Sequence, residues 1–213
     1  MHREQTAPTG SASKRIRRSP EAARAEIIRA AEVALAELSF NQLTVDVLMQ
    51  RTGMTRSSFY HYFSGLDELL AGLLEGFERD IVASVDPWLS GDEAVDPRQA
   101  TLDSLTRMLQ VFREHAPLVD AVNQAASGNP RVYRRWQTRV IGAFIDKTTG
   151  FIEKQVARGL SRVDDPARTA NALIRMNSAV AHDNLTGAHP DTPEAVAQVL
   201  AGIWNSVLYG TVG

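Results

Sequence analysis

Hydrogen-bonding and aromatic side chains alternate along residues 54–63, whose sequence is MTRSSFYHYF. If a helix starts after Thr55, Phe59 and Phe63 lie four residues apart on one face and pack inward. The opposite face then carries Arg56, Ser57, Tyr60 and His61. Such groups hydrogen-bond to phosphate oxygens and base edges, and a tyrosine ring can contact a thymine methyl. The pattern predicts a helix that contacts DNA; the alternative is a helical hairpin whose polar face meets only water.

Acid–base and metal chemistry have weaker candidates. His182 and Asp183, His189, and the pair Asp164–Asp165 stand beside glycine or proline at predicted helix ends, where aspartate caps helices. No second histidine lies at metal-ligand spacing, and no nucleophile–base pair converges with these residues. The chain has no cysteine, which excludes disulfides and thiolate metal sites. We therefore expect no catalytic residue, no metal site and no cofactor.

Three short helices must position the 54–63 stretch. Ser19 is a good N-cap, and the helix that follows it has a 3.6-residue apolar face. That face consists of Ile27, Ala31, Ala34, Leu35 and Leu38. Thr44 would cap a second, short helix that ends at Gly53, and Thr55 would start the third. This order, with a tight glycine turn between two short helices, predicts a helix-turn-helix within a domain at residues 19–65.

The chain beyond residue 65 has helical periodicity and no strand alternation. Breaks at proline and glycine, such as Pro87, Pro117 and the GNP at 128–130, separate the candidate helices. These helices are 66–85, 98–115, 117–128, 130–158, 165–184 and 193–209. We predict an all-α fold of about nine helices, with a three-helix N-terminal domain and a helical C-terminal domain at residues 66–213.

Charge is distributed unevenly along the 213 residues, although the formal net charge is only −2. Residues 1–65 carry nine Lys/Arg against six Asp/Glu, whereas residues 66–213 carry fourteen against nineteen. Residues 1–18 lack periodicity and end in the basic KRIRR segment, so we expect a disordered arm that meets a polyanion or serves only as a solubilising tail. With no apolar signal region and no run of eighteen apolar residues, we expect a cytoplasmic protein that contacts no membrane.

The sequence LTVDVLMQRTGMTRSSFYHYFSGLDELL at 43–70 resembles the helix-turn-helix of the TetR family of bacterial transcriptional repressors. The family positions are Leu43, Thr44, Gly53, Thr55, Tyr60, Tyr62 and Phe63. Leu66 departs from the pattern, because the family commonly has a phosphate-facing lysine there; the basic arm would substitute for it. The resemblance implies a homodimer that binds a palindromic operator. Our candidate DNA contacts are Lys14, Arg15, Arg17, Arg18, Thr44, Thr55, Arg56, Ser57, Ser58, Tyr60, His61 and Tyr62.

Aromatic residues of the C-terminal region lie at helical spacing with a few polar groups among them. Such stripes line either a close-packed core or a small-molecule pocket between helices. The segments HAPLVDAVNQAA, LIRMNSA and GIWNSVLYG resemble the EthR-like branch of the family, which implies a long apolar pocket gated by an asparagine. Lys147, where that branch has an aromatic ring, implies a differently shaped or more polar cavity. The candidate ligand-binding residues are Phe112, Ile141, Phe144, Thr148, Met176, Asn177 and Trp204.

The resemblance also implies that the last two helices pair with their two-fold mates in the dimer. Small residues such as Ala170, Ala179 and Ala201 would permit close approach across that axis. The function we expect is a homodimeric repressor that an apolar small molecule releases from its operator. Two other classes stay open at this point: a helical enzyme with a DNA-binding head, and a structural DNA-binding protein without a ligand.

Overall fold

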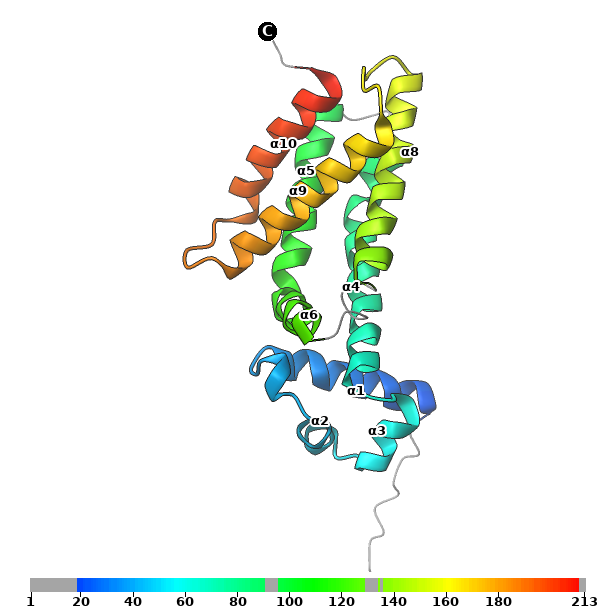
Figure 1. Cartoon of the computed structure of the whole chain (residues 1–213), viewed down its shortest axis with the longest axis vertical. Helices are drawn as coiled ribbons and strands as arrows, with labels where there is room; N and C mark the ends of the chain where they lie inside the picture. Colours follow the sequence, from blue (N-terminus) through cyan, green and yellow to red (C-terminus); the bar gives the residue numbers. More distant parts are fainter. Residues whose placement is uncertain (1–18, 91–95, 129–133, 135, 211–213) are drawn as a thin grey trace, which may run out of the picture.

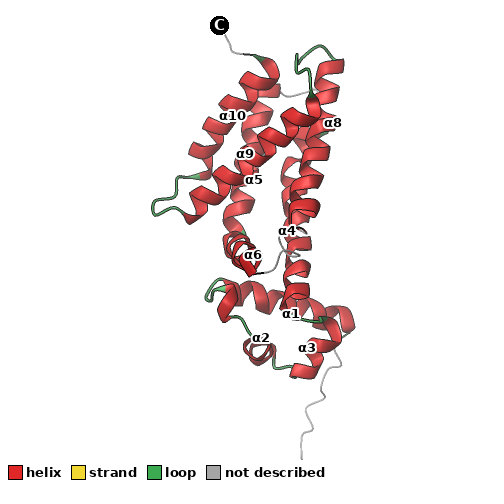
Figure 2. Cartoon of the chain, in the orientation of Figure 1, coloured by secondary structure: helices red, strands yellow, loops and turns green. Residues whose placement is uncertain are grey.

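The structure is a computed structural model that describes residues 19–90, 96–128, 134 and 136–210. Over these residues the chain forms nine α-helices, one 3₁₀ turn and one π-helical segment, with no strand (Figure 2). The all-α prediction is confirmed. The predicted arm at residues 1–18 lies outside the described residues. Within the described part, no helix is both long and apolar enough to cross a membrane.

The first three helices form a head at one end of the molecule (Figure 1). They are α1 (Pro20–Leu35), α2 (Val45–Thr52) and α3 (Arg56–Tyr62), with the 3₁₀ turn η1 (Phe40–Gln42) after α1. Ser19 caps α1 as predicted, because its hydroxyl accepts a hydrogen bond from the Ala22 amide at 3.1 Å. Leu38, predicted to lie on the helix face, instead lies in the turn beyond α1, where it is only partly buried.

Helix α4 (Leu66–Leu89) leads from the head into the body and extends past the break predicted at Pro87. A proline in the last helical turn removes only one backbone hydrogen bond. Trp88 and Leu89, which follow it, are both buried. Ser90 ends the helix with bonds to the Asp86 and Pro87 carbonyls. Packing of these side chains therefore carries the helix beyond the predicted end at residue 85.

Four further segments build the body together with α4 and the last two helices. They are α5 (Pro97–Glu114), α6 (Ala116–Gly128), the π-helical η2 (Gln137–Gly142) and α8 (Ala143–Ala157). The first two match the predicted spans within one residue. The prediction of a regular α-helix over 130–158 is wrong at residues 137–142, where the structure has a π-helical segment. Residues 130–133 of the predicted helix lie outside the described residues. π-segments often occur at functional sites.

The last two helices, α9 (Pro166–Thr186) and α10 (Pro193–Tyr209), match their predicted spans closely. Helix α9 crosses the body, and α10 packs along α5 (Figure 1). Asp165 and Thr192 cap these helices by accepting hydrogen bonds from the Arg168 and Ala195 amides. Buried apolar residues run without interruption from α1 in the head to α10 in the body.

Candidate DNA-binding face and effector region

Local capping fixes the two helices of the turn. The Thr44 hydroxyl accepts from the Val47 amide at 3.2 Å, and the Thr55 hydroxyl accepts from the Ser58 amide at 3.3 Å. Between the two helices Gly53 has φ 64°, a left-handed conformation that glycine adopts without a Cβ penalty. Each cap is worth about 1 kcal/mol. These three residues therefore set the angle at which α3 leaves α2, as the sequence predicted.

The inward face of α3 is apolar and buried. Phe59 is fully buried, Phe63 is 1% exposed, and their ring centroids lie 5.6 Å apart. The guanidinium of Arg24 on α1 lies 5.2 Å from the Phe63 ring centroid, so α1 covers the outer edge of this aromatic pair. The predicted inward role of both phenylalanines is confirmed, and it orients the rest of α3 outward.

The outward face of α3 carries the predicted polar and aromatic groups. Arg56, Ser57, Tyr60 and His61 are all exposed. Tyr60 keeps 50% of its surface exposed, which is unusual for an aromatic residue. Tyr62 is half-buried against the core, and its ring meets the His61 ring edge-on at 4.9 Å. The face therefore has exposed groups that can contact a partner, and the Tyr62 ring beside it packs against His61.

Hydrogen bonds organise this face before any partner binds. Arg56 donates to the Asp46 carboxylate at 2.8 Å and to the Tyr60 hydroxyl at 3.4 Å. These bonds, the Tyr60 bond foremost, raise the pKa of Arg56, which remains a cation at any physiological pH. The guanidinium also lies 5.8 Å from the Tyr60 ring centroid. Arg56 and Tyr60 thus contact each other on α3, and Asp46 on α2 fixes the position of the Arg56 guanidinium.

The hydroxyl groups at the start of α3 form a second small network. The Thr55 hydroxyl lies 2.9 Å from both the Ser57 and the Ser58 hydroxyls. Thr44 and Thr55 are exposed, but their oxygens already serve as helix caps. Leu66 packs against the core, where the family commonly has a lysine. Four predicted contacts, Lys14, Arg15, Arg17 and Arg18, lie outside the described residues.

In the body, Asn177 and Trp204 come together from two helices. The Trp204 indole N–H donates to the Asn177 side-chain oxygen at 3.1 Å, and both residues are buried. The Asn177 amide nitrogen and the Thr148 hydroxyl are buried without a partner among the described residues. A buried donor of this kind costs about 1–3 kcal/mol until something accepts its hydrogen bond.

Two residues of this aromatic core, Trp88 and Phe151, are absent from the predicted ligand set. Trp88 lies 4.6 Å from Phe151 and 5.2 Å from Trp204, measured between ring centroids. The predicted helix ends at residue 85, before Pro87, so the sequence did not place Trp88 in the core of the body. The signal that could have included Trp88 is its apolar periodicity with Ile81 and Val85 at helical spacing.

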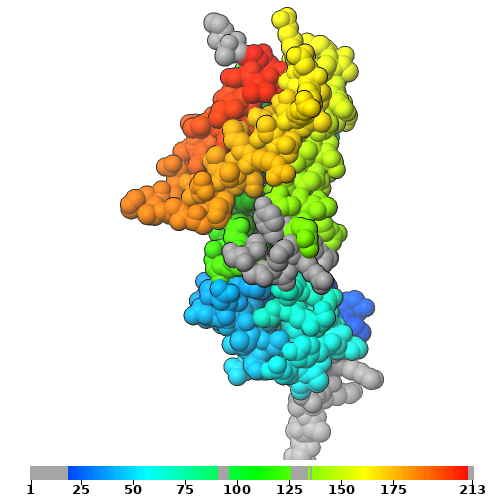
Figure 3. Space-filling view, in the orientation of Figure 1, coloured from blue at the N-terminus to red at the C-terminus, as the bar shows by residue number. Residues whose placement is uncertain are grey.

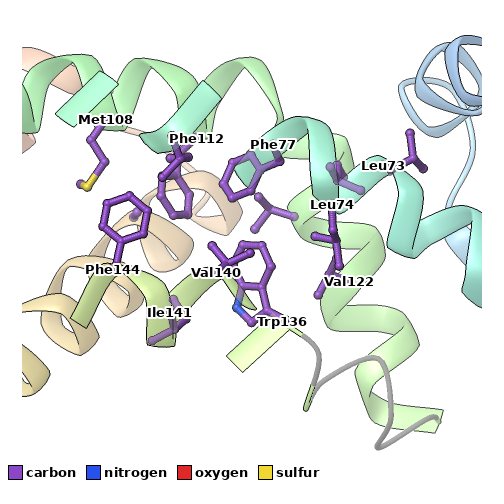
Figure 4. Packing of buried hydrophobic residues seen from close by; sticks show 14 of the residues in the cluster. Leu73, Leu74, Phe77, Met108, Phe112, Val122, Trp136, Val140, Ile141 and Phe144 are labelled. Atoms are coloured by element: carbon purple, nitrogen blue, oxygen red, sulfur yellow. The ribbon is translucent and has the colours of Figure 1, made fainter. Parts of the chain in front are cut away.

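Phe112 and Ile141, also in the predicted ligand set, line an open cleft of about 230 Å³ between α5, α6, η2 and α9. Phe112, Ile141 and the neighbouring Trp136 appear together in Figure 4. Phe144, also labelled there, is buried in the same cluster, and Met176 is partly buried. The cleft is lined by Phe112, Val119, Asn123, Trp136, Gln137, Ile141, Arg175, Ser178, Ala179 and His182.

The two last helices also differ from prediction in their small residues. Ala170 and Ala201 are buried within the protomer, so the expectation that they permit close approach of a second copy is wrong; Ala179 is exposed. Helix α10 instead exposes an apolar strip at four-residue spacing, formed by Val199, Ile203 and Val207. Helices α9 and α10 lie on one face of the molecule (Figure 3). Among the described residues, no group of three His, Asp or Glu is placed to hold a metal.

Comparison with known proteins agrees with this architecture. Residues 27–73 match the model of bacterial regulatory proteins of the tetR family, and residues 101–210 match that of the transcriptional regulator EthR, C-terminal domain. The chain is 26% identical over 190 residues to the HTH-type transcriptional regulator EthR of Mycolicibacterium smegmatis, covering 88% of this chain and 87% of that one. It is 25% identical over 186 residues to EthR of Mycobacterium tuberculosis, covering 86% of each.

Solved structures show the same fold at lower identity. A protein from Mesorhizobium loti assigned to the TetR family superposes with a TM-score of 0.74 at 18% identity, covering 90% of this chain and 98% of that chain. A TetR transcription regulator from Haloarcula marismortui superposes with a TM-score of 0.71 at 18% identity, covering 87% and 98%. The relatives are regulators rather than enzymes, which removes the helical-enzyme alternative. The chain therefore belongs to the TetR family of transcriptional regulators, with a C-terminal domain of the EthR type.

Proposed function

We propose that the chain represses transcription as a homodimer on a palindromic operator and that an apolar small molecule releases it. The observation that carries the proposal is the outward face of α3, where Arg56, Tyr60 and His61 are exposed on a frame fixed by two caps and a glycine turn. A recognition helix of this kind uses its N-terminal residues on base edges in the major groove. The regulator would act in the cytoplasm.

The apolar strip of α10 supports the homodimer. Val199, Ile203 and Val207 are 65%, 40% and 43% exposed, which leaves a row of branched side chains in water on a helix with few charges. A self-complementary patch on α9 and α10 is what an isologous two-fold contact requires. Two heads related by that axis would need α3 helices about 34–36 Å apart to reach successive major grooves.

Unpaired polar atoms in the body support an effector with a polar group. The Asn177 amide nitrogen lies on α9 and the Thr148 hydroxyl on α8, and these two helices pack together. A ligand carbonyl that accepts from Asn177 would remove the penalty of about 1–3 kcal/mol that the unpaired donor carries. A plain hydrocarbon would not, so the site would favour ligands with a carbonyl or amide.

Helix α6 offers a route from the body to the head. The Phe40 amide of η1 donates to the Gln124 side-chain oxygen at 3.1 Å, and α6 also packs on α1. Asn123, the residue before Gln124, lines the cleft. A ligand that moves α6 would tilt the head through this bond, and one that prefers the tilted conformer shifts the population toward it. The tilted heads would then no longer match successive grooves.

The operator can be identified by selection from random DNA. The chain is used to select duplexes from a library with a randomised core, and the selected duplexes are titrated in sedimentation velocity experiments. We expect a palindromic consensus and a protein-to-duplex ratio of two, or a multiple of two. A non-palindromic consensus bound by a single chain would contradict the homodimer, and absence of any consensus would leave a structural DNA-binding protein as the better description.

The basic arm makes a separate contribution in this proposal. Each phosphate that a cation neutralises adds about 0.9 to the slope of log affinity against log salt. Deleting residues 1–18 removes Lys14, Arg15, Arg17 and Arg18 and should flatten that slope while leaving the circular dichroism spectrum of the fold unchanged. An unchanged slope would show that the arm is only a solubilising tail.

A further inference from the structure

The cleft between α5, α6, η2 and α9 has an apolar floor and a polar mouth. Phe112, Trp136 and Ile141 are all buried to at least nine-tenths and supply the floor. Arg175 and His182 on α9 and Asn123 on α6 supply the polar groups. A site of this composition binds a molecule that has both an apolar body and a polar end.

Arg175 differs in its binding partners from the arginines that form ion pairs in the described part of the chain. Arg51, Arg56 and Arg168 each pair with a carboxylate. Arg175 donates from Nε to the Asn171 side-chain oxygen at 2.8 Å and from Nη1 to the Gln137 side-chain oxygen at 3.2 Å. Both partners are neutral amides, so within the described residues its charge has no counter-ion. The two amides fix the plane of the guanidinium and leave Nη2 without a protein partner in the described part of the chain.

His182 lies at the same mouth of the cleft. Its Nδ1 lies 3.1 Å from the Asn123 amide nitrogen. Because an amide nitrogen only donates, Nδ1 must accept, and the proton of the neutral ring is then on Nε2. The mouth of the cleft therefore carries one fixed cation and one imidazole ring over an apolar floor.

We infer that this cleft binds small amphipathic carboxylates, with the carboxylate on Arg175 and the hydrocarbon on Phe112, Trp136 and Ile141. The inference rests on the proposed function, since it names the chemical class of an effector. The cleft is a second site beside the one proposed at Asn177 and Thr148, because neither of these residues lines it. A planar guanidinium already oriented by neighbours is well suited to a carboxylate, because its Nη2 can donate to a carboxylate oxygen without ordering the side chain afresh. The positive charge also disfavours amines of the same length.

Three ligands with the same hydrocarbon chain test this inference by isothermal titration calorimetry: octanoate, octan-1-ol and octylamine. A hydrogen bond to a charged group is stronger than a neutral one, so octanoate should bind about ten-fold or more tightly than octan-1-ol. Arg175→Gln should lower the affinity for octanoate to that for octan-1-ol and leave the affinity for octan-1-ol unchanged. Arg168→Gln, on the same helix but paired with Asp165, is the matched control and should change neither.

Each other outcome overturns the inference. Equal affinity of the wild-type chain for octanoate and octan-1-ol would show that the cleft does not distinguish a carboxylate from a hydroxyl group. If Arg175→Gln lowered the affinity for both ligands equally, the residue would have a structural role. Loss of dimer in sedimentation velocity, with octanoate affinity unchanged, would assign Arg175 to a subunit contact.

Release of DNA separates this inference from the proposed function. If octanoate binds through Arg175 but does not release the selected duplex, the carboxylate site stands and its effector role fails. If another compound releases the duplex from Arg175→Gln as readily as from wild type, while octanoate shows no preference over octan-1-ol, the repressor function stands and the carboxylate site falls.

Discussion

The head and the body differ in whether their buried polar side-chain atoms have hydrogen-bond partners. In the head, the hydroxyls of Thr44 and Thr55 each cap a helix, and within the described residues 19–65 no buried side-chain polar atom lacks a partner. In the body, buried polar atoms without partners occur on α4, α5, α8, α9 and α10, at Trp88, Ser104, Thr148, Gln155, Asn177, Asn205 and Tyr209. Native cores pair most of their buried polar groups, so such a concentration needs an explanation. The head pairs its buried polar side-chain atoms and exposes donors on α3, whereas the body keeps both donors and acceptors buried without a partner among the described residues.

The largest change in stability is expected from a substitution in the core of the head. Phe59 is fully buried, and Phe59→Ala should lower the free energy of unfolding by about 3–5 kcal/mol because it leaves a cavity between α1, α2 and α3. Urea denaturation followed by circular dichroism measures this loss. Tyr60→Ala is the matched control, since this half-exposed neighbour on the same helix has only surface contacts to lose and should change stability by about 1 kcal/mol. Equal effects of both substitutions would mean that α3 is not anchored as described.

The same substitution in the two regions should have opposite signs. Thr55→Val removes a helix cap and should cost about 1 kcal/mol. Thr148→Val replaces a buried, unpaired hydroxyl by a methyl group of similar size and should raise stability by about 1–3 kcal/mol in the ligand-free protein. Thermal or urea unfolding of the two variants gives both values. If Thr148→Val destabilises the ligand-free chain, the hydroxyl has a partner and the contrast between the regions disappears.

An effect confined to high pH is expected from Tyr209 at the end of α10. Burial raises the pKa of the Tyr209 phenol to about 12. Since the unfolded chain has a pKa of about 10, the folded state favours the neutral phenol, and this contribution is lost as pH rises from about 10 to 12. Tyr209→Phe should therefore flatten the decline of stability over that range. An equally steep decline in Tyr209→Phe and in wild type would contradict this effect.

Much of the head followed from the sequence because its determinants are local. A threonine before each short helix, a glycine between them and two phenylalanines four residues apart fix α2 and α3 with little help from distant residues. The end of α4 did not follow, because Trp88 is held by Phe151 and Trp204 from other helices. The π-helical widening at η2 and the burial of Ala170 and Ala201 likewise depend on packing between helices. The domain boundary at residues 65 and 66, and the roles of the predicted contact residues, remain predictions.

The central claim, that the outward face of α3 reads operator DNA, is tested most directly at Tyr60. Fluorescence anisotropy would measure the affinity of wild type, Tyr60→Ala and Tyr60→Phe for the duplex selected by the protein itself. The account predicts that Tyr60→Ala loses about 1–3 kcal/mol of binding free energy, the scale of a lost specific contact, with circular dichroism and dimerisation unchanged. Tyr60→Phe should fall between the two if the hydroxyl contributes beside the ring. Wild-type affinity for the operator in the folded Tyr60→Ala variant would contradict the claim.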